Sequence, residues 1–303
     1  MATEAAGRAR KAGEASPLQS FLWRRPWLRA SLLLTPPLGW FVIIYLASLA
    51  LLLVTAFWQL NSFTTHVEQV WNLDNFRTIL FDPTYHLIIG RTVGMAAAVT
   101  ITDAAIAFPF AYYMARVASR RTQTLLFAAV LLPLWASYIA RVYSWILILN
   151  PNGPLNWGLG ALHLPPANIG YTNVAMWIVF SYVWLPFMIV PVYSALERVP
   201  ESFLGAAADL GARRLQSLLD VLLPLALPGI AAGSIFTFSL TLGDYITPIL
   251  VGGNGSSFIG NIAYANIGIA NNVPFAAAVA TVPIAIMAVY LLAARRLGAF
   301  EAL

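Results

Sequence analysis

Long apolar segments alternate with short polar ones along the chain. An α-helix needs about 20 apolar residues to cross the hydrocarbon core of a bilayer, and six segments of this chain reach that length. They cover approximately residues 32–58, 87–115, 124–149, 172–196, 218–242 and 273–294. All six are too long for the strands of a core sheet, and none shows an alternation of period two. The pattern predicts an all-α membrane protein with six transmembrane helices in one domain, residues 31–296.

Composition narrows the class of protein further. Of the 303 residues, 60% are hydrophobic and only 10% are charged, whereas soluble domains carry about 25% charged residues. Cysteine is absent and the three histidines lie far apart, so we expect no disulfide, no metal site and no cofactor in this chain. The only lysine, Lys11, precedes Ala12, so the chain lacks the G-x-x-x-x-G-K-[ST] loop that binds ATP. We therefore expect no enzymatic activity here, and any ATP hydrolysis would occur on a separate subunit.

Basic residues orient the predicted helices. Of the 17 Lys and Arg residues, 14 precede the first span, follow the sixth, or lie in the second-to-third and fourth-to-fifth connections. The loops on the opposite side contain only Arg77. By the positive-inside rule, both termini are predicted to be cytoplasmic. Residues 1–30 then form a basic arm, disordered over its first half, and residues 297–303 form a tail. The net charge of +5 is concentrated in membrane loops, so we expect no nucleic-acid partner.

A polar connection, residues 200–216, follows the fourth span. Pro200 suits the first turn of a short helix, where its missing N–H costs nothing. Gly211 suits the end of that helix, because glycine accepts the left-handed conformation of a C-cap. A second helix is predicted to begin near Ala212 and to lead into the fifth span.

The spacing of small residues in this connection resembles that of a known family. Gly205-Ala206-Ala207 is followed by three residues, Gly211, nine residues and Val221-Leu222-Leu223-Pro224. This pattern is similar to the Glu-Ala-Ala loop by which permease subunits of bacterial ABC importers dock onto their ATPases. Here Gly205 replaces the glutamate and Val221 replaces an isoleucine, and Glu201, one helical turn earlier, is the candidate substitute for the missing carboxylate. The resemblance implies ATPase contacts from Glu201, Gly205, Ala206, Ala207, Asp209, Gly211 and Pro224.

Two further stretches look like the spermidine/putrescine-type branch of these permeases. They are residues 132–156, with the run Arg141-Val142-Tyr143-Ser144-Trp145, and residues 242–253, which begin Leu242-Gly243-Asp244-Tyr245. The resemblance covers approximately residues 30–296. It implies a subunit of an inner-membrane importer for a polyamine or a similar small polar solute. The implied partners are an ATPase dimer that binds ATP and Mg²⁺, a second and distinct permease, an external solute-binding protein and the lipid bilayer.

Four charged side chains fall inside the predicted spans or at their outer mouth. Arg91 and Asp103 lie in the second span, Arg141 lies in the third, and Asp244 follows the fifth. Ionisable groups at membrane depth are costly, so they usually face a partner or a water-filled cavity. Arg91 is close enough to the outer end of its span to snorkel. Asp103, Arg141 and Asp244 are candidate residues of a translocation pathway; a structural contact or a helix-end turn is the alternative for each.

Other functions stay open on the sequence alone. A stand-alone secondary transporter of a small polar solute would need ionisable groups in mid-membrane, and only Asp103 offers one. A membrane scaffold would have no use for a docking loop. A membrane enzyme would need a convergent set of His, Asp or Glu side chains, and the sequence suggests none.

Overall fold

The computed structural model describes residues 25–61, 63–253 and 255–296 of a chain that divides into two units, residues 1–55 and 56–303. In the first unit, α3 (Pro26–Trp40), a π-helical turn η1 (Phe41–Leu46) and α4 (Ala47–Thr55) form one apolar helix. This helix is long and apolar enough to cross a membrane, as predicted for residues 32–58. It begins at Pro26, so the last residues of the predicted arm are helical. The disorder predicted for the start of the arm and the tail at residues 297–303 lie outside the described residues.

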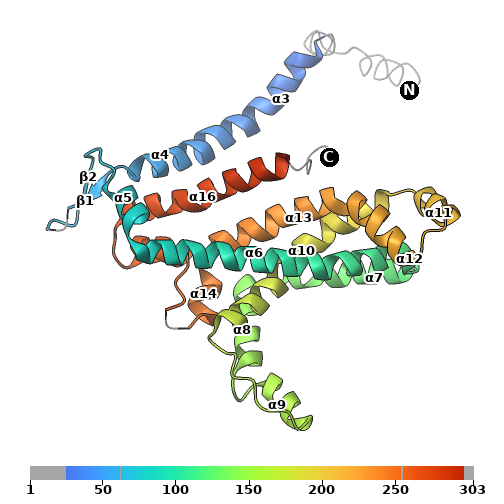
Figure 1. Ribbon diagram of the computed structural model, residues 1–303. Coiled ribbons are helices and arrows are strands. Elements are labelled where there is room, and N and C mark those ends of the chain that lie inside the picture. The colour runs from blue at the N-terminus through green and yellow to red at the C-terminus, as the bar shows by residue number, and fades with distance from the viewer. Residues whose placement is uncertain (1–24, 62, 254, 297–303) are drawn as a thin grey trace, which may run out of the picture. The chain divides into compact units, whose positions relative to one another are not determined.

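Three long helices form the centre of the second unit. They are α6 (Pro83–Tyr112), which continues into a π-helical turn η2 (Tyr113–Val117), α10 (Asn173–Arg198) and α13 (Leu223–Gly243). These helices pack against one another (Figure 1). A fourth long helix, α16 (Val273–Arg296), packs against α13, α5 (Asp74–Phe81) and α15 (Ile259–Gly268). The four helices correspond to the second, fourth, fifth and sixth predicted spans.

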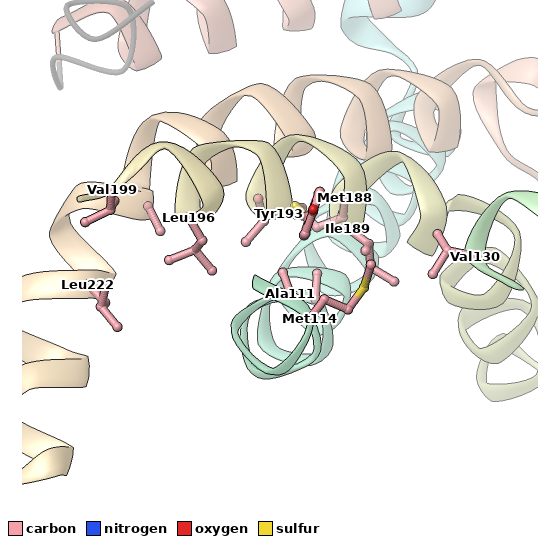
Figure 2. Close-up of a cluster of buried hydrophobic side chains, with 12 residues drawn as sticks. Ala111, Met114, Val130, Met188, Ile189, Tyr193, Leu196, Val199 and Leu222 are labelled. Carbon is pink, nitrogen blue, oxygen red and sulfur yellow. The ribbon is translucent and has the colours of Figure 1, made fainter. Parts of the chain in front are cut away.

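Alanine, methionine and branched apolar side chains fill the space between these helices. Figure 2 shows one buried cluster, in which Ala111 and Met114 of α6 and η2 lie close to Met188 and Ile189 of α10. Lipid tails are as apolar as leucine, so helices in a membrane associate through close van der Waals fit rather than through the hydrophobic effect. The closeness of fit between the helices therefore matters more here than the apolar area that they bury.

The third predicted span is broken. α7 (Arg120–Leu131) passes into a short 3₁₀-helix η3 (Leu132–Trp135), and α8 (Tyr138–Leu149) follows. The segment Tyr138–Ala161 lies at an angle of 96° to the segment Arg120–Trp135. Ala136 and Ser137 between them have extended backbones, with ψ of 147° and 138°. The prediction of one continuous helix over residues 124–149 was wrong. Five helices of the described chain can cross a membrane on their own, or six if this bent pair counts as one span, and the all-α class is confirmed.

Several connections between the long helices also contain regular structure. Between the first two spans lies a small antiparallel hairpin, β1 (Gln59–Leu60) and β2 (Val67–Glu68), which precedes α5. The Asn75 side chain holds the start of α5 by donating hydrogen bonds to the carbonyls of Ala56 and Trp58 at 2.9 and 2.8 Å. After α8 comes α9 (Pro154–Ala161), and after α13 comes α14 (Ile246–Val251). The two residues directly before α14 contribute to the pocket described below.

Candidate functional site

The connection between α10 and α13 forms a short helix, as predicted. α11 (Glu201–Asp209) is followed by α12 (Arg214–Gln216) and a π-helical turn η4 (Ser217–Leu222), which leads into α13. The N–H of Ala212 donates to the carbonyl of Ala207 at 3.0 Å, and the N–H of Gly211 donates to that of Ala208 at 2.9 Å. These are the two hydrogen bonds of a Schellman C-cap, which requires a left-handed residue. Gly211 supplies it, with φ of +83°, so its predicted role as the helix end is confirmed.

Most of the predicted docking residues are exposed on and around α11. Of the seven, only Ala207 is buried. Phe203 and Leu210 add exposed apolar surface, with 50% and 89% of their areas accessible. Apart from the backbone of α11 itself, no atom of the described residues lies within 4 Å of the position that a Cβ would take at Gly205, so the glutamate of the family pattern would have room there. A small exposed helix of this composition suits a protein partner, and contact with an ATPase stays a prediction.

A pocket of about 300 Å³ opens beside the C-terminal end of α13, away from α11. Its walls come from α8, α10, α13 and the two residues directly before α14. The lining residues are Tyr138, Trp184, Ser239, Leu240, Gly243, Asp244 and Tyr245. Three of them are aromatic and one, Asp244, is a carboxylic acid, so the pocket combines ring faces with a single carboxylate.

The Asp244 carboxylate is held entirely by neutral donors. Its Oδ1 accepts hydrogen bonds from the N–H groups of Ile246 at 2.8 Å and Thr247 at 3.3 Å, which makes it the cap of α14. Its Oδ2 accepts from the Thr247 hydroxyl at 2.9 Å and from the Tyr138 hydroxyl. Within the described residues, no Arg, Lys or His forms an ion pair with it. Asp244 is buried, so the pocket is lined by a carboxyl group that accepts hydrogen bonds but forms no ion pair with the described residues.

Aromatic side chains form the wall next to this carboxylate. The rings of Tyr138 and Trp184 are stacked, with centroids 5.6 Å apart and an interplanar angle of 18°. Tyr245 stacks in turn on Tyr264 at 4.7 Å. Ring faces attract ammonium and guanidinium groups, and the Arg141 guanidinium carbon lies 5.8 Å from the centre of the Tyr138 ring. A pocket with a carboxylate and several ring faces is chemically suited to an amine.

The other predicted pathway residues lie outside this pocket. Arg141 reaches it only through its contact with the Tyr138 ring. Asp103, on α6, is fully buried against α10, near Ser181, and in the described part of the chain neither of its carboxylate oxygens has a hydrogen-bond partner. Arg91 donates a hydrogen bond to the carbonyl of Gly255. Of the three pathway candidates, Asp244 is the one that lines this cavity.

Replacement of Asp103 by asparagine is expected to raise thermal stability and to leave solute uptake within about twofold of the wild-type value. A buried carboxylate without a partner costs more than a neutral amide, and an asparagine side chain at this position would keep the volume. The checks are the melting temperature of the purified protein and initial uptake rates at matched protein amounts. A tenfold loss of uptake with unchanged stability would assign Asp103 to the pathway.

A second pocket, of about 360 Å³, lies where α10 and α13 meet α11. Apart from Arg198 and Ser194, its lining is apolar. A cavity whose charged side chain is an arginine does not suit a cationic solute, so we do not place the solute there.

Sequence reasoning missed the aromatic part of the site. Tyr138 and Tyr245 both fall in the stretches that resemble polyamine permeases, and Tyr245 directly follows Asp244. Nothing in the local pattern distinguishes Trp184 from the other tryptophans, because its role depends on stacking against a distant segment.

Comparison with known proteins identifies the family. The family described as "Binding-protein-dependent transport system inner membrane component" matches residues 107–299. The chain is 48% identical over 299 residues to the inner membrane ABC transporter permease protein YdcU of Escherichia coli, covering 94% of this chain and 95% of that protein. It is 32% identical over 228 residues to the spermidine/putrescine transport system permease protein PotB of Escherichia coli, covering 74% and 81%.

Solved structures agree on the fold. A bacterial ABC transporter involved in the import of the acidic polysaccharide alginate matches with a TM-score of 0.72 at 19% identity, covering 92% of this chain and 98% of the other. A crystal structure of bacterial alginate ABC transporter in complex with alginate pentasaccharide-bound periplasmic protein matches with a TM-score of 0.74 at 18% identity, covering 90% and 96%. This chain therefore belongs to the family of binding-protein-dependent transport system inner membrane components, and it is a permease subunit of an ABC importer.

Proposed function

We propose that this permease forms part of the translocation pathway for a polyamine, such as spermidine or putrescine, or for a similar small polar solute. The observation that carries the proposal is the pocket at Asp244, where a carboxyl group without an ion pair among the described residues lies beside stacked aromatic rings. The likeness to the spermidine/putrescine permease PotB supports the same solute class.

The chemistry of the pocket fits one ammonium group. At 4 Å, two opposite unit charges attract with about 4 kcal/mol at an effective dielectric constant of 20, and a ring face contributes about 0.5–2 kcal/mol. Attraction of this size holds a protonated amine briefly without trapping it. A pathway needs such weak sites, because a solute that binds too tightly does not leave.

The assembly proposed around the chain has further components. An ATPase dimer, which binds ATP and Mg²⁺ and carries out the hydrolysis, contacts α11. A second, distinct permease completes the pathway, and an external binding protein delivers the solute. Both termini and α11 lie on the cytoplasmic side of the inner membrane, as the distribution of basic residues supports.

The proposed coupling transmits movement of α11 to the pocket through the two helices that adjoin α11 in the chain. Closure of the ATPase pair displaces α11, which joins α10 through Val199 and Pro200 and joins α13 through α12 and η4. α10 contributes Trp184 to the pocket, and α13 ends directly before Asp244. Movement of α11 therefore shifts two walls of the pocket, and the pathway opens alternately to the two sides of the membrane.

The experiment that tests this function is uptake of radiolabelled spermidine into proteoliposomes. We expect ATP-dependent uptake when the permease is reconstituted with its ATPase, second permease and binding protein, and none when the ATPase is omitted. Uptake by the permease alone, driven by an ion gradient, would instead support a secondary transporter. Uptake of neutral sugars but not of amines would exclude a polyamine as the solute and would leave the assignment as an importer permease intact.

Replacement of Gly211 by alanine or valine is expected to reduce uptake several-fold in the same assay, with valine the more severe. The left-handed conformation costs a residue with a Cβ about 1–2 kcal/mol, so the C-terminal end of α11 would lose its cap. Gly158→Ala is the matched control, because the Cβ added on α9 meets no atom within 4 Å. Wild-type uptake by Gly211→Val would contradict the docking role of this loop.

A further inference from the structure

Arg116 lies where the end of α6 meets the end of α10. Its guanidinium Nη2 donates hydrogen bonds to two carbonyls at the end of α10, those of Leu196, at 2.7 Å, and Val199. Arg116 belongs to η2, so these bonds join the end of one long helix to the end of another. Figure 2 shows Leu196 and Val199 at this end of α10, in the same buried cluster as Leu222 of η4.

The sequence at the end of α10 leaves the carbonyl of Leu196 without its usual helical N–H donor. In a continuing helix, the carbonyl of Leu196 would accept a hydrogen bond from the residue four positions later. That residue is Pro200, which has no N–H. The N–H of Val199 reaches the carbonyl of Leu196 at 3.3 Å, and the guanidinium adds a shorter, charge-assisted bond. A cation at the C-terminal end of a helix also interacts favourably with the helix dipole.

A second polar contact joins α7 to the same turn of α10. Gln123, on α7, donates a hydrogen bond to the Tyr193 hydroxyl, which in turn donates to Glu197 Oε1 at 2.8 Å. The ends of α6, α7 and α10 are therefore held together directly before the chain enters α11. Pro200 is the single residue between Val199 and the first residue of α11.

We propose that Arg116 is a positioning residue that makes α6 and α10 move together when α11 is displaced. The proposal rests on the proposed docking of an ATPase at α11. With the Arg116 bonds in place, a displacement of α11 moves both α6 and α10. Trp184 of the pocket lies on α10, about 18 Å along the helix axis from Leu196 at 1.5 Å per residue. Without these bonds, α11 rotates about Pro200 and α6 does not follow its movement. Less solute is then transported per ATP hydrolysed.

The first test measures coupling in the complete importer, reconstituted in proteoliposomes. In Arg116→Ala, we expect the ATPase to stay bound and its rate to remain within about twofold of wild type, while spermidine uptake per ATP hydrolysed falls at least about fivefold. Arg116→Lys should fall in between, because the ammonium keeps the positive charge but does not reproduce the position of the guanidinium Nη2, which donates both bonds. Arg121→Ala is the control, since this exposed side chain on α7 forms no hydrogen bond within the described residues.

The outcomes separate this proposal from the one on which it rests. An unchanged ratio of uptake to hydrolysis in Arg116→Ala overturns the role of Arg116 and leaves the docking of α11 intact. Uptake and hydrolysis that fall together, in proportion to the amount of assembled complex, also overturn it, because that result indicates a purely structural role. A wild-type permease that binds no ATPase overturns both.

The second test needs only the purified permease. The chain has no cysteine, so Ser202→Cys on α11 and Leu125→Cys on α7, both exposed, can carry a pair of spin labels. We expect a narrow distribution of label distances with Arg116 present and a broader one in Arg116→Ala or Arg116→Lys. Equal widths in all three proteins would overturn the proposal.

Discussion

A permease with Gly229→Leu is expected to lose most of its folded population. Gly229 lies on α13 and faces α10 so closely that a Cβ would stand 2.6 Å from the carbonyl oxygen of Pro191 and 2.6 Å from the Cβ of Ala195. The carbonyl belongs to the backbone of α10 and cannot turn away, so the two helices would have to separate. Overpacking of this kind costs about 1–3 kcal/mol where side chains can adjust, and more is expected where backbone must move.

Gly233, one helical turn further along α13, provides an internal comparison. A Cβ there would stand 2.6 Å from the sulfur of Met188 and 3.0 Å from its Cα. The methionine sulfur can move to another rotamer, so Gly233→Leu should destabilise the fold less than Gly229→Leu does. Small residues four positions apart are a common means of close helix packing in membranes.

The measurement is thermal unfolding of the detergent-solubilised protein, with the amount of monodisperse protein as a second readout. Gly94→Leu on α6 is the control, because a Cβ at this exposed glycine meets no atom within 4 Å. We expect Gly94→Leu to unfold at the wild-type temperature. A Gly229→Leu protein that also does so would show that α10 and α13 do not pack as described.

Asp244→Asn is expected to reduce spermidine uptake at least tenfold while the fold is retained. Asparagine keeps an oxygen that accepts hydrogen bonds from the N–H groups of Ile246 and Thr247, so α14 keeps its cap. The substitution removes the negative charge, however, and with it the attraction for an ammonium group. Tenfold corresponds to about 1.4 kcal/mol, well below the attraction of about 4 kcal/mol available at 4 Å.

Asp82→Asn is the matched control for this experiment. Asp82 also caps a helix, accepting a hydrogen bond from the N–H of Thr84 at 2.8 Å at the start of α6. That N–H lowers the pKa of the Asp82 carboxyl, so at neutral pH this substitution also removes a negative charge. Uptake should stay at the wild-type level in Asp82→Asn. Equal losses in both variants would attribute the effect to helix capping, and wild-type uptake by Asp244→Asn would remove Asp244 from the pathway.

The sequence by itself determined the features that depend on neighbouring residues. Apolar length predicted all five described helices that can cross a membrane on their own, because a span is a property of one continuous segment. Pro200 and Gly211 predicted α11 and its end, because helix ends are decided by the residues at and next to them. The spacing from Gly205 to Pro224 indicated the family that the comparisons confirm.

Only the tertiary structure decided where the third span breaks. Pro133 stands at the break, but Pro186 and Pro191 lie inside α10 without interrupting it. A proline removes one hydrogen bond in every case, and the surrounding helices decide whether the chain kinks slightly or turns away. The local pattern of residues 124–149 was therefore equally compatible with a continuous helix.

The pocket and the Arg116 contact also depended on the fold. Tyr138 and Asp244 are 106 positions apart, and Arg116 and Leu196 are 80 apart. Hydropathy and capping describe how each residue relates to its own segment, and they contain no information about which distant segment packs beside it. The sequence showed that Asp244 is a carboxylate at a helix end; only the packing of α8 and α10 around it made that carboxylate part of a pocket.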